Sequence, residues 1–304
     1  MKIYSLLTLF LGIIMLFLTF LSLNNNLTSI KSPKKAETVT IKDADSGEKS
    51  ETEMFGYIVG CVAGEMPALY ETEALKAQAV ACYTYQKYLK EHGTDEITDS
   101  SEIHQAYKTQ DELKALWGKK YDSYFEKISS AVESVYGEYL VYNNETALTL
   151  YHALSDGSTK NAKEVFGKDL RYLRSVTAPG DRLSPDYMNE KVFTCEEIKV
   201  LISENNINVD SDFSIEIENE TDDSYVKNIS FGNTDLSAEK IREIFSLSSP
   251  YFTAEANNDT VVFTSYGKGH GVGMSQYSAD YMARQGSSYE EILLHFYSDT
   301  ELKK

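Results

Sequence analysis

The distribution of apolar residues divides the chain into three parts. The first is an uncharged apolar run over residues 3–23, which is long enough to cross the core of a bilayer. A cleaved signal peptide is the alternative, but the run ends in Leu21-Ser22-Leu23-Asn24, without the small residues that mark a cleavage site. We therefore predict a transmembrane anchor over residues 1–23. Lysines lie on both sides of the run, so the positive-inside rule does not fix its orientation.

The second and third parts differ in polarity. Residues 24–53 are rich in Asn, Lys, Ser, Thr, Asp and Glu and lack a sustained apolar period, which predicts a flexible, solvated linker. Residues 54–304 contain apolar residues at both helical and strand periods. Their number is at the upper end of the range for a single domain, so we expect one folded domain behind the anchor and linker.

The strongest pattern in the third part lies at residues 57–93. An apolar run over residues 57–63 predicts a short buried strand. Pro67 fixes its own φ and disfavours a helical Met66, so we expect Glu65 on an extended or turn segment. A long helix should fill the rest of this stretch, since apolar residues recur there at three- and four-residue steps. That apolar stripe consists of Leu75, Ala79, Cys82, Gln86 and Leu89.

The same periodicities predict further elements. Thr194 is expected to cap a helix, and Asn143-Asn144 to connect two strands into a hairpin. Because strands and helices follow one another without regular alternation, the predicted fold class is α+β, a single mixed helix and sheet domain. Helices are expected at residues 112–118, 121–136, 195–205, 237–245, 275–285 and 289–297, and strands at residues 139–142, 147–152, 213–218, 226–231 and 260–264.

Charge and cysteine content narrow the possible partners and the redox chemistry. The formal net charge is −18 and the sequence pI is near 4.7. A protein that neutralises phosphates needs a basic face, so nucleic acid is not expected as a partner. The three cysteines are an odd number and lack CxxC spacing. Cys61 and Cys82 lie in apolar patterns, which favours core positions and leaves a disulfide between them open.

A glycine-rich loop at residues 267–273 is one candidate site. Its four glycines at alternate positions allow a sharp fold or a close approach to a ligand, and exposed amides before a helix at Ser275 suit an oxygen-rich ligand. The loop lacks the spacing of a phosphate-binding loop or a dinucleotide fold. His270 within it is a hydrogen-bond donor or a general acid near neutral pH. A purely structural turn is the alternative.

Glu65 is the other candidate site, and the sequence does not indicate a further reaction centre. HExxH is absent and the five histidines are scattered, so we predict no metal and no other cofactor. GxSxG is also absent, and no cysteine lies in an electropositive setting. A carboxyl held between a buried strand and a packed helix is well placed for a raised pKa. The alternative for Glu65 is a harmless strand end.

Three longer strings lie in the third part of the chain. The first joins Glu65-Met66-Pro67 to residues 73–81, EALKAQAVA. In the second, Tyr151-His152 is followed by Ser155, Gly157 and Thr159, and the third is residues 269–277, GHGVGMSQY. Together, and in this order, they closely resemble the stage II sporulation protein D family. The resemblance spans roughly residues 55–300, and a hydrophobic anchor near the start also fits.

This resemblance implies a membrane-anchored lytic transglycosylase that acts outside the cytoplasmic membrane, between the mother cell and forespore membranes, during engulfment. Such enzymes cleave the β-1,4 bond between N-acetylmuramic acid and N-acetylglucosamine in peptide-stripped peptidoglycan glycan strands, and leave a 1,6-anhydro end. The family's catalytic acid corresponds to Glu65. Stage II sporulation proteins P, an amidase, and M, a membrane protein, are the implied partners. The cleft would be lined by His152, Ser155, Thr159, His270, Ser275 and Gln276.

The chain departs from the family pattern at two places. Some members bind zinc through histidine and cysteine around a CQxY-like string, whereas residues 104–107 here are HQAY. Thr98 and Ile103 stand where two further ligands are expected, so we predict no zinc. Cys82-Tyr83 replaces a common Ala-Arg, so an ion pair of that arginine is not expected.

Two other functions stay open at the level of sequence. One is a non-catalytic glycan-binding scaffold that recruits a cell-wall amidase; it would bind glycan without releasing an anhydro product. The other is a cell-wall hydrolase that acts outside sporulation, because related domains occur in other wall proteins. The timing of expression would separate this function from a sporulation enzyme.

Overall fold

The computed structural model describes residues 37–100, 103–207, 214–219, 225–257 and 259–304. Residues 39–304 form one compact unit. The predicted anchor lies outside the described part of the chain. Within that part, no helix combines the length and the apolar character that crossing a bilayer requires.

Part of the segment assigned to the linker is folded. Strands β1 (Thr38–Lys42) and β2 (Lys49–Glu53) form a sheet with β3 (Glu96–Thr98), in which β1 is central and parallel to β3. Val39 and Ile41 alternate with polar residues and are buried, which is the period of a strand with one face in the core. Two apolar residues are too few to reveal a strand within the polar composition of residues 24–53. The linker prediction was therefore wrong for residues 38–53.

The predicted strand at residues 57–63 is also wrong. Residues Met54–Glu65 form a helix, α2, and residues 57–63 are buried without a polar face. A fully buried helix and a buried strand are both continuous apolar runs, so periodicity alone does not separate them. Pro67 acts as expected, since Met66 is extended at φ −121° and ψ 143°. Glu65 is therefore the last residue of a helix and not part of an extended segment.

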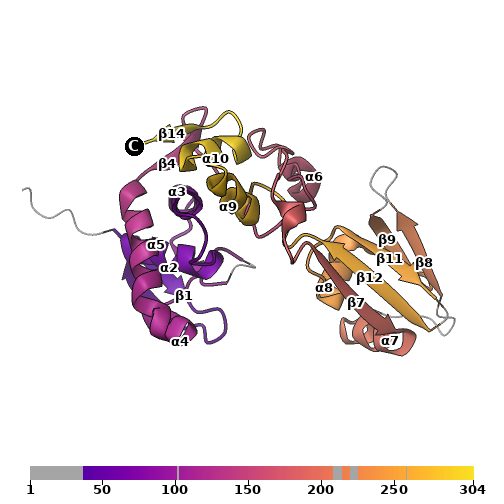
Figure 1. Cartoon of the computed structure of the whole chain (residues 1–304). Coiled ribbons are helices and arrows are strands. Elements are labelled where there is room, and N and C mark those ends of the chain that lie inside the picture. Colours follow the sequence, from indigo (N-terminus) through magenta and orange to yellow (C-terminus); the bar gives the residue numbers. More distant parts are fainter. Residues whose placement is uncertain (1–36, 101–102, 208–213, 220–224, 258) are drawn as a thin grey trace, which may run out of the picture. The chain divides into compact units, whose positions relative to one another are not determined.

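Helix α3 (Thr72–Glu91) is the centre of the larger hydrophobic core (Figure 1). It contacts α2, α5 (Tyr121–Val135), α9 (Gln276–Arg284) and α10 (Tyr289–Phe296). These neighbours surround it, so small residues such as Ala77 and Ala79 are buried as well as the predicted stripe. The helices predicted at residues 121–136, 275–285 and 289–297 are confirmed to within one or two residues. Shorter helices in this part are α4 (Gln110–Trp117), η1 (Gly118–Lys120), α6 (Ala162–Phe166) and η2 (Asp181–Leu183).

Two small sheets complete this core. The predicted turn at Asn143-Asn144 is confirmed, and both residues have positive φ. The turn joins β4 (Tyr139–Tyr142) to β5 (Glu145–Thr146), and β14 (Glu301–Lys303) pairs with β4 on its other side. The second hairpin strand predicted at residues 147–152 is therefore wrong, because β5 ends at Thr146, before that range begins. Instead, β6 (Tyr151–His152) pairs in parallel with β13 (Met274–Ser275), which joins the second and third motif strings.

A second, smaller hydrophobic core lies between residues 188 and 266. The helices predicted at residues 195–205 and 237–245 are confirmed, with N-caps at Thr194 and Ser237. The strands predicted from residues 213, 226 and 260 are confirmed as β8, β9 and β12, and β8 pairs with β9. With both helices and sheets in each core, the α+β class is confirmed. The elements are β7 (Met188–Thr194), α7 (Cys195–Glu204), β8 (Ile215–Asn219), β9 (Val226–Phe231), β10 (Thr234–Ser237), α8 (Ala238–Phe245), β11 (Phe252–Ala256) and β12 (Thr260–Tyr266).

Candidate active site

The Glu65 carboxyl lies where three distant segments of the chain meet. The backbone N–H of Ala106 donates to its Oε1 over 2.6 Å, and the hydroxyl of Tyr151 donates to the same oxygen over 3.3 Å. The Nε2 of Gln276 donates to Oε2 over 3.4 Å. Tyr151 and Gln276 are close because β6 and β13 pair directly before α9 begins. The end of α2 therefore holds this carboxyl at the junction of all three motif strings.

Burial controls the protonation of this carboxyl. Glu65 is partly buried, and the loss of water raises its pKa, while its three hydrogen-bond donors lower it by less. A raised pKa favours the protonated acid closer to neutral pH than for a solvated glutamate. A partly buried acid with a raised pKa has the properties of a general acid that can also act as a base.

His152 and His270 form a second cluster, with ring centroids 5.9 Å apart. Both bind the backbone of Val272: His152 Nδ1 donates to its carbonyl over 3.1 Å, and its N–H donates to His270 Nδ1 over 3.0 Å. Burial lowers the pKa of His152 to about 4 and that of His270 to about 3. Both rings are therefore neutral at pH 7 and tie the glycine-rich loop to β6.

The glycine-rich loop is shaped by close packing. Gly273 has φ +77°, and a Cβ there would lie 1.9 Å from the carbonyl oxygen of Leu150. Only glycine fits such a position. This packing supports a structural role for the loop, which lets β13 run next to the strand that carries Tyr151.

Ser155 and Ser275 bind a buried carboxylate that the sequence did not reveal. The backbone N–H and the hydroxyl of Ser155 donate to Asp181 Oδ2, both over 2.6 Å. The hydroxyls of Ser275 and Ser278 donate to Oδ1 over 2.7 and 2.6 Å. The hydroxyl groups of both predicted site serines thus donate to Asp181. Their contact with substrate, predicted from the resemblance, stays a prediction.

Thr159 is wholly buried and bonded to the backbone of a segment that follows α6. Its hydroxyl donates to the carbonyl of Arg174 over 3.2 Å and accepts from the N–H of Val176 over 2.9 Å. Of the six residues expected to line the cleft, Gln276 is therefore the one that the structure bonds directly to Glu65. The substrate-binding role of the other five remains a prediction.

Comparison with known proteins places the chain in a family. Residues 43–142 match the family model described as SpoIID, stage II sporulation protein. Stage II sporulation protein D of Bacillus subtilis (strain 168) is 35% identical over 255 residues, covering 82% of this chain and 74% of the relative. The protein of the same name from Bacillus amyloliquefaciens is 33% identical over 254 residues, with 82% and 73% covered. This chain belongs to the stage II sporulation protein D family.

A more distant relative carries a different name. The amidase enhancer of Bacillus subtilis (strain 168) is 24% identical over 295 residues, which cover 80% of this chain but 40% of the relative. The residues that match the SpoIID family include α2, α3 and the segment that supplies Ala106, and therefore Glu65. Gln276 and the glycine-rich loop follow later in the chain, outside residues 43–142.

Several residues around Glu65 were not predicted as site residues. Tyr151 and Gln78 lie inside the motif strings of the family, so those strings contained a signal that composition alone does not give. Ala106 acts through its backbone, which no residue type reveals. In the same string, Gln105 accepts from the hydroxyl of Tyr57 over 3.0 Å. This segment therefore contacts α2 at both ends, through Gln105 at Tyr57 in its first turn and through Ala106 at Glu65.

The structure gives other partners to the residues compared with the family's zinc ligands. His104 Nδ1 accepts from the N–H of Thr98 over 3.0 Å, and His92 Nδ1 bonds the carbonyl of Tyr88 over 2.8 Å. No cluster of three His, Cys, Asp or Glu that could hold a metal occurs among the described residues. Cys61 and Cys82 are both buried and free, so the disulfide that the sequence left open is not formed.

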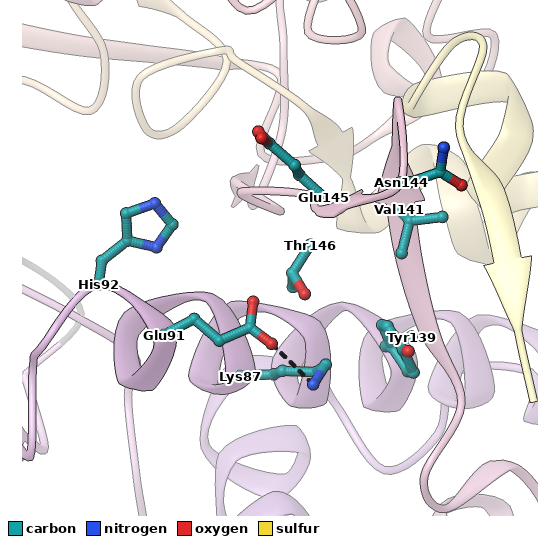
Figure 2. Close-up of a pocket in the computed structure, with 8 residues that line it drawn as sticks. All are labelled: Lys87, Glu91, His92, Tyr139, Val141, Asn144, Glu145 and Thr146. Atoms are coloured by element: carbon teal, nitrogen blue, oxygen red, sulfur yellow. Dashed lines mark ion pairs between the residues drawn. The ribbon is translucent and has the colours of Figure 1, made fainter.

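A surface hollow of about 420 Å³ lies elsewhere on the same core (Figure 2). Lys87 and Glu91 of α3 form an ion pair of 2.8 Å in its wall, and Lys87 lies 4.7 Å from the centroid of the Tyr139 ring. The paired charges compensate each other, and Glu65 is not among the residues that line the hollow. The cluster around Glu65 is therefore the better candidate for acid–base chemistry.

Proposed function

We propose that this chain is a lytic transglycosylase that cleaves the bond between N-acetylmuramic acid and N-acetylglucosamine in peptidoglycan, with Glu65 as its single catalytic carboxyl. The observation that carries the proposal is the setting of Glu65: a partly buried carboxyl whose pKa is raised by lost hydration. No second carboxylate is among the described groups that set this pKa. Glycosidases that use water need a pair of carboxyl groups.

One carboxyl suffices when the substrate supplies the nucleophile. Protonated Glu65 donates its proton to the glycosidic oxygen as the bond from that oxygen to C1 of the muramic acid breaks. The 6-hydroxyl of the same sugar then attacks C1, and the Glu65 carboxylate accepts its proton. The products are a 1,6-anhydro end and a free 4-hydroxyl on the next sugar. Glu65 returns to its protonated form, so no water is consumed.

The hydrogen bonds around Glu65 suit both halves of this cycle. Burial favours the neutral acid needed for the first proton transfer. The donors from Ala106, Tyr151 and Gln276 then stabilise the carboxylate formed by that transfer. Activity should fall as pH rises through the raised pKa of Glu65, because the deprotonated form cannot donate.

Family membership supports the biological setting of the proposal. The substrate would be glycan stripped of stem peptides, cleaved outside the cytoplasmic membrane during engulfment of the forespore. Residues 1–23 would anchor the enzyme in that membrane, with the catalytic domain between the mother cell and forespore membranes. Stage II sporulation proteins P and M are the proposed partners.

The test is the digestion of peptide-stripped glycan strands by the purified full chain and its Glu65→Gln variant. Mass spectrometry should detect 1,6-anhydro-muramic acid ends with the wild-type protein and none above background with the variant. New reducing N-acetylmuramic acid ends, formed during the digestion, would contradict the proposal, because hydrolysis creates them and transglycosylation does not. Full cleavage by Glu65→Gln would also contradict it.

A second candidate is a non-catalytic glycan-binding scaffold that recruits an amidase. The name of the distant relative, amidase enhancer, favours it. In that case the wild-type protein and Glu65→Gln would bind glycan equally and release no anhydro ends, while both would increase cleavage by an added cell-wall amidase.

A further inference from the structure

A closed ring of polar contacts runs through the Glu65 carboxyl. From Oε2 it passes to Gln276 Nε2 over 3.4 Å, and from that nitrogen to Gln78 Oε1 over 3.4 Å. Gln78 Nε2 donates to the Cys82 sulfur over 3.3 Å, and this sulfur lies 3.8 Å from the Tyr151 hydroxyl. The Tyr151 hydroxyl returns to Glu65 Oε1 over 3.3 Å. The side chains of Gln78 and Cys82 on α3 thus connect the two carboxyl oxygens.

Within this ring, Gln78 determines which end of the Gln276 amide faces Glu65. Its side chain is wholly buried and uses both ends of its amide, Oε1 as an acceptor and Nε2 as a donor. An amide has a donor end and an acceptor end of similar size, so its orientation follows from its hydrogen-bond partners. Because Gln78 presents an acceptor to Gln276, the Gln276 nitrogen faces Glu65, where its oxygen would repel a carboxylate.

We propose that Gln78 is a positioning residue for the catalytic acid: it holds the Gln276 amide with its donor end toward the Glu65 carboxyl. Gln78 bonds neither Glu65 nor, at its buried position, a substrate, so it acts through Gln276. The inference rests on the proposed function of Glu65. Its physical consequence, a better stabilised Glu65 carboxylate, can be measured without any catalysis.

The pKa of Glu65 can be measured separately because its titratable neighbours do not change charge over the same pH range. Cys61 of α2, Cys82 of α3 and Tyr151 of β6 are its titratable neighbours. Burial raises the pKa of each, to about 12 for Cys82, so all three stay neutral while Glu65 titrates. A hydrogen bond from Gln276 lowers the pKa of Glu65. Losing that orientation should therefore raise the pKa of Glu65 further.

The experiment replaces Gln78 by methionine, which keeps the length of the side chain and removes both hydrogen bonds. Gln86→Met is the matched control, because Gln86 is a buried glutamine two turns later on α3 and its Oε1 has no partner in the described structure. The pKa of Glu65 is measured in the full chain in detergent micelles, by carbon NMR of labelled glutamate side chains. The Glu65 signal is assigned by its absence in Glu65→Gln.

In Gln78→Met we expect the pKa of Glu65 to rise by about half a unit to one unit, and the alkaline limb of the pH–rate profile to move up with it. We expect kcat to fall about tenfold with KM unchanged, as for a lost hydrogen bond to a charged group. Gln86→Met should leave the pKa, kcat and KM at wild-type values. An unchanged Glu65 pKa in Gln78→Met would overturn the inference, even if the wild-type protein is an active transglycosylase.

Two further outcomes separate this inference from the proposed function. If the wild-type protein releases no anhydro ends but Gln78→Met still raises the pKa of Glu65, the proposed function is wrong and the positioning role stands. If Gln78→Met does not fold, Cys82→Ala tests the same ring, because it removes the partner of Gln78 Nε2. It should raise the pKa of Glu65 in the same direction by a smaller amount, and no rise would overturn the inference.

Discussion

Glu65 is partly buried and Asp181 is wholly buried, and both carboxyl groups have a raised pKa with lost hydration as the largest cause. Their hydrogen bonds differ. Asp181 accepts four bonds of 2.6 to 2.7 Å from Ser155, Ser275 and Ser278. Glu65 accepts one short bond, from the backbone of Ala106, and two side-chain bonds of 3.3 and 3.4 Å. Burial alone therefore does not identify a catalytic acid.

The difference lies in what each carboxyl connects. Asp181 joins the loop after β6 to the start of α9, so its bonds hold two motif strings together. Glu65 ends a helix, is partly exposed, and has longer bonds that a reacting proton can replace. A fully satisfied buried carboxylate is a structural element, whereas a loosely bonded one retains capacity for proton transfer.

The Glu65→Gln substitution should give the largest effect. It keeps the size of the side chain and removes the transferable proton, so glycan cleavage should fall by about 10²- to 10⁴-fold. The free energy of unfolding should stay within about 1 kcal/mol of wild type, because the amide removes a poorly hydrated charge. Chemical denaturation monitored by circular dichroism gives the control. A loss of activity accompanied by a large loss of stability would argue for a structural Glu65.

The matching substitution Asp181→Asn should show the opposite profile. The amide nitrogen cannot accept, so two of the four donors lose their acceptor, and the backbone N–H of Ser155 cannot rotate away. Each buried unsatisfied donor costs about 1–3 kcal/mol, so we expect the free energy of unfolding to fall by about 2–3 kcal/mol. Thermal and denaturant unfolding measure it. A stable but inactive Asp181→Asn would move Asp181 from the structural group into the catalytic machinery.

Much of the fold could be predicted from the sequence, and the exceptions have physical causes. The helices at α5, α7, α8, α9 and α10 are amphipathic or capped, and such patterns identify a helix reliably. Helix α2 has no polar face, so its run looks like a strand. The strands β1 and β2 are short segments of a polar region, and β1 pairs with β3, which lies more than 50 residues later.

The candidate site was only partly predictable. Glu65 and Gln276 stand in motif strings of the family, so their proximity could be expected. The bond from Ala106 comes from the backbone, and Asp181 begins the short helix η2, outside the motif strings. His152 and Ser275 are neighbours in paired strands, but alternation along each strand directs their side chains away from the Tyr151 side of the sheet. Side-chain direction of this kind needs the strand register, which sequence alone does not supply.

The free energy of unfolding, measured as a function of pH, distinguishes the contribution of His152 from that of the carboxyl groups of Glu65 and Asp181. The pKa of His152 is lowered to about 4 by burial, whereas an unfolded histidine titrates near about 6.5. The unfolded state therefore binds more protons between these values, and stability should fall as pH falls through this window. Between pH 7.5 and 5.0 the loss from His152 should be about 2 kcal/mol. Buried carboxyls with a raised pKa act with the opposite sign, because their folded forms bind protons first.

The His152→Asn variant isolates this contribution. Its amide nitrogen can still donate to the Val272 carbonyl, but the side chain does not titrate. Denaturant unfolding at pH 7.5 and 5.0 should therefore show a smaller loss of stability in the variant than in the wild-type protein. An equal loss in both would mean that other groups cause the pH dependence.

The smallest effect is expected at the hollow in Figure 2, where charges are exposed. Lys87 and Glu91 lie four residues apart on α3, and their side chains are 32% and 44% exposed. Exposed pairs of this kind contribute about 0.3–0.5 kcal/mol and weaken with salt. Lys87→Met should therefore lower the free energy of unfolding by no more than about 0.5 kcal/mol and leave glycan cleavage unchanged. A loss of cleavage in Lys87→Met with Glu65 at its wild-type pKa would show that the hollow is part of the functional surface.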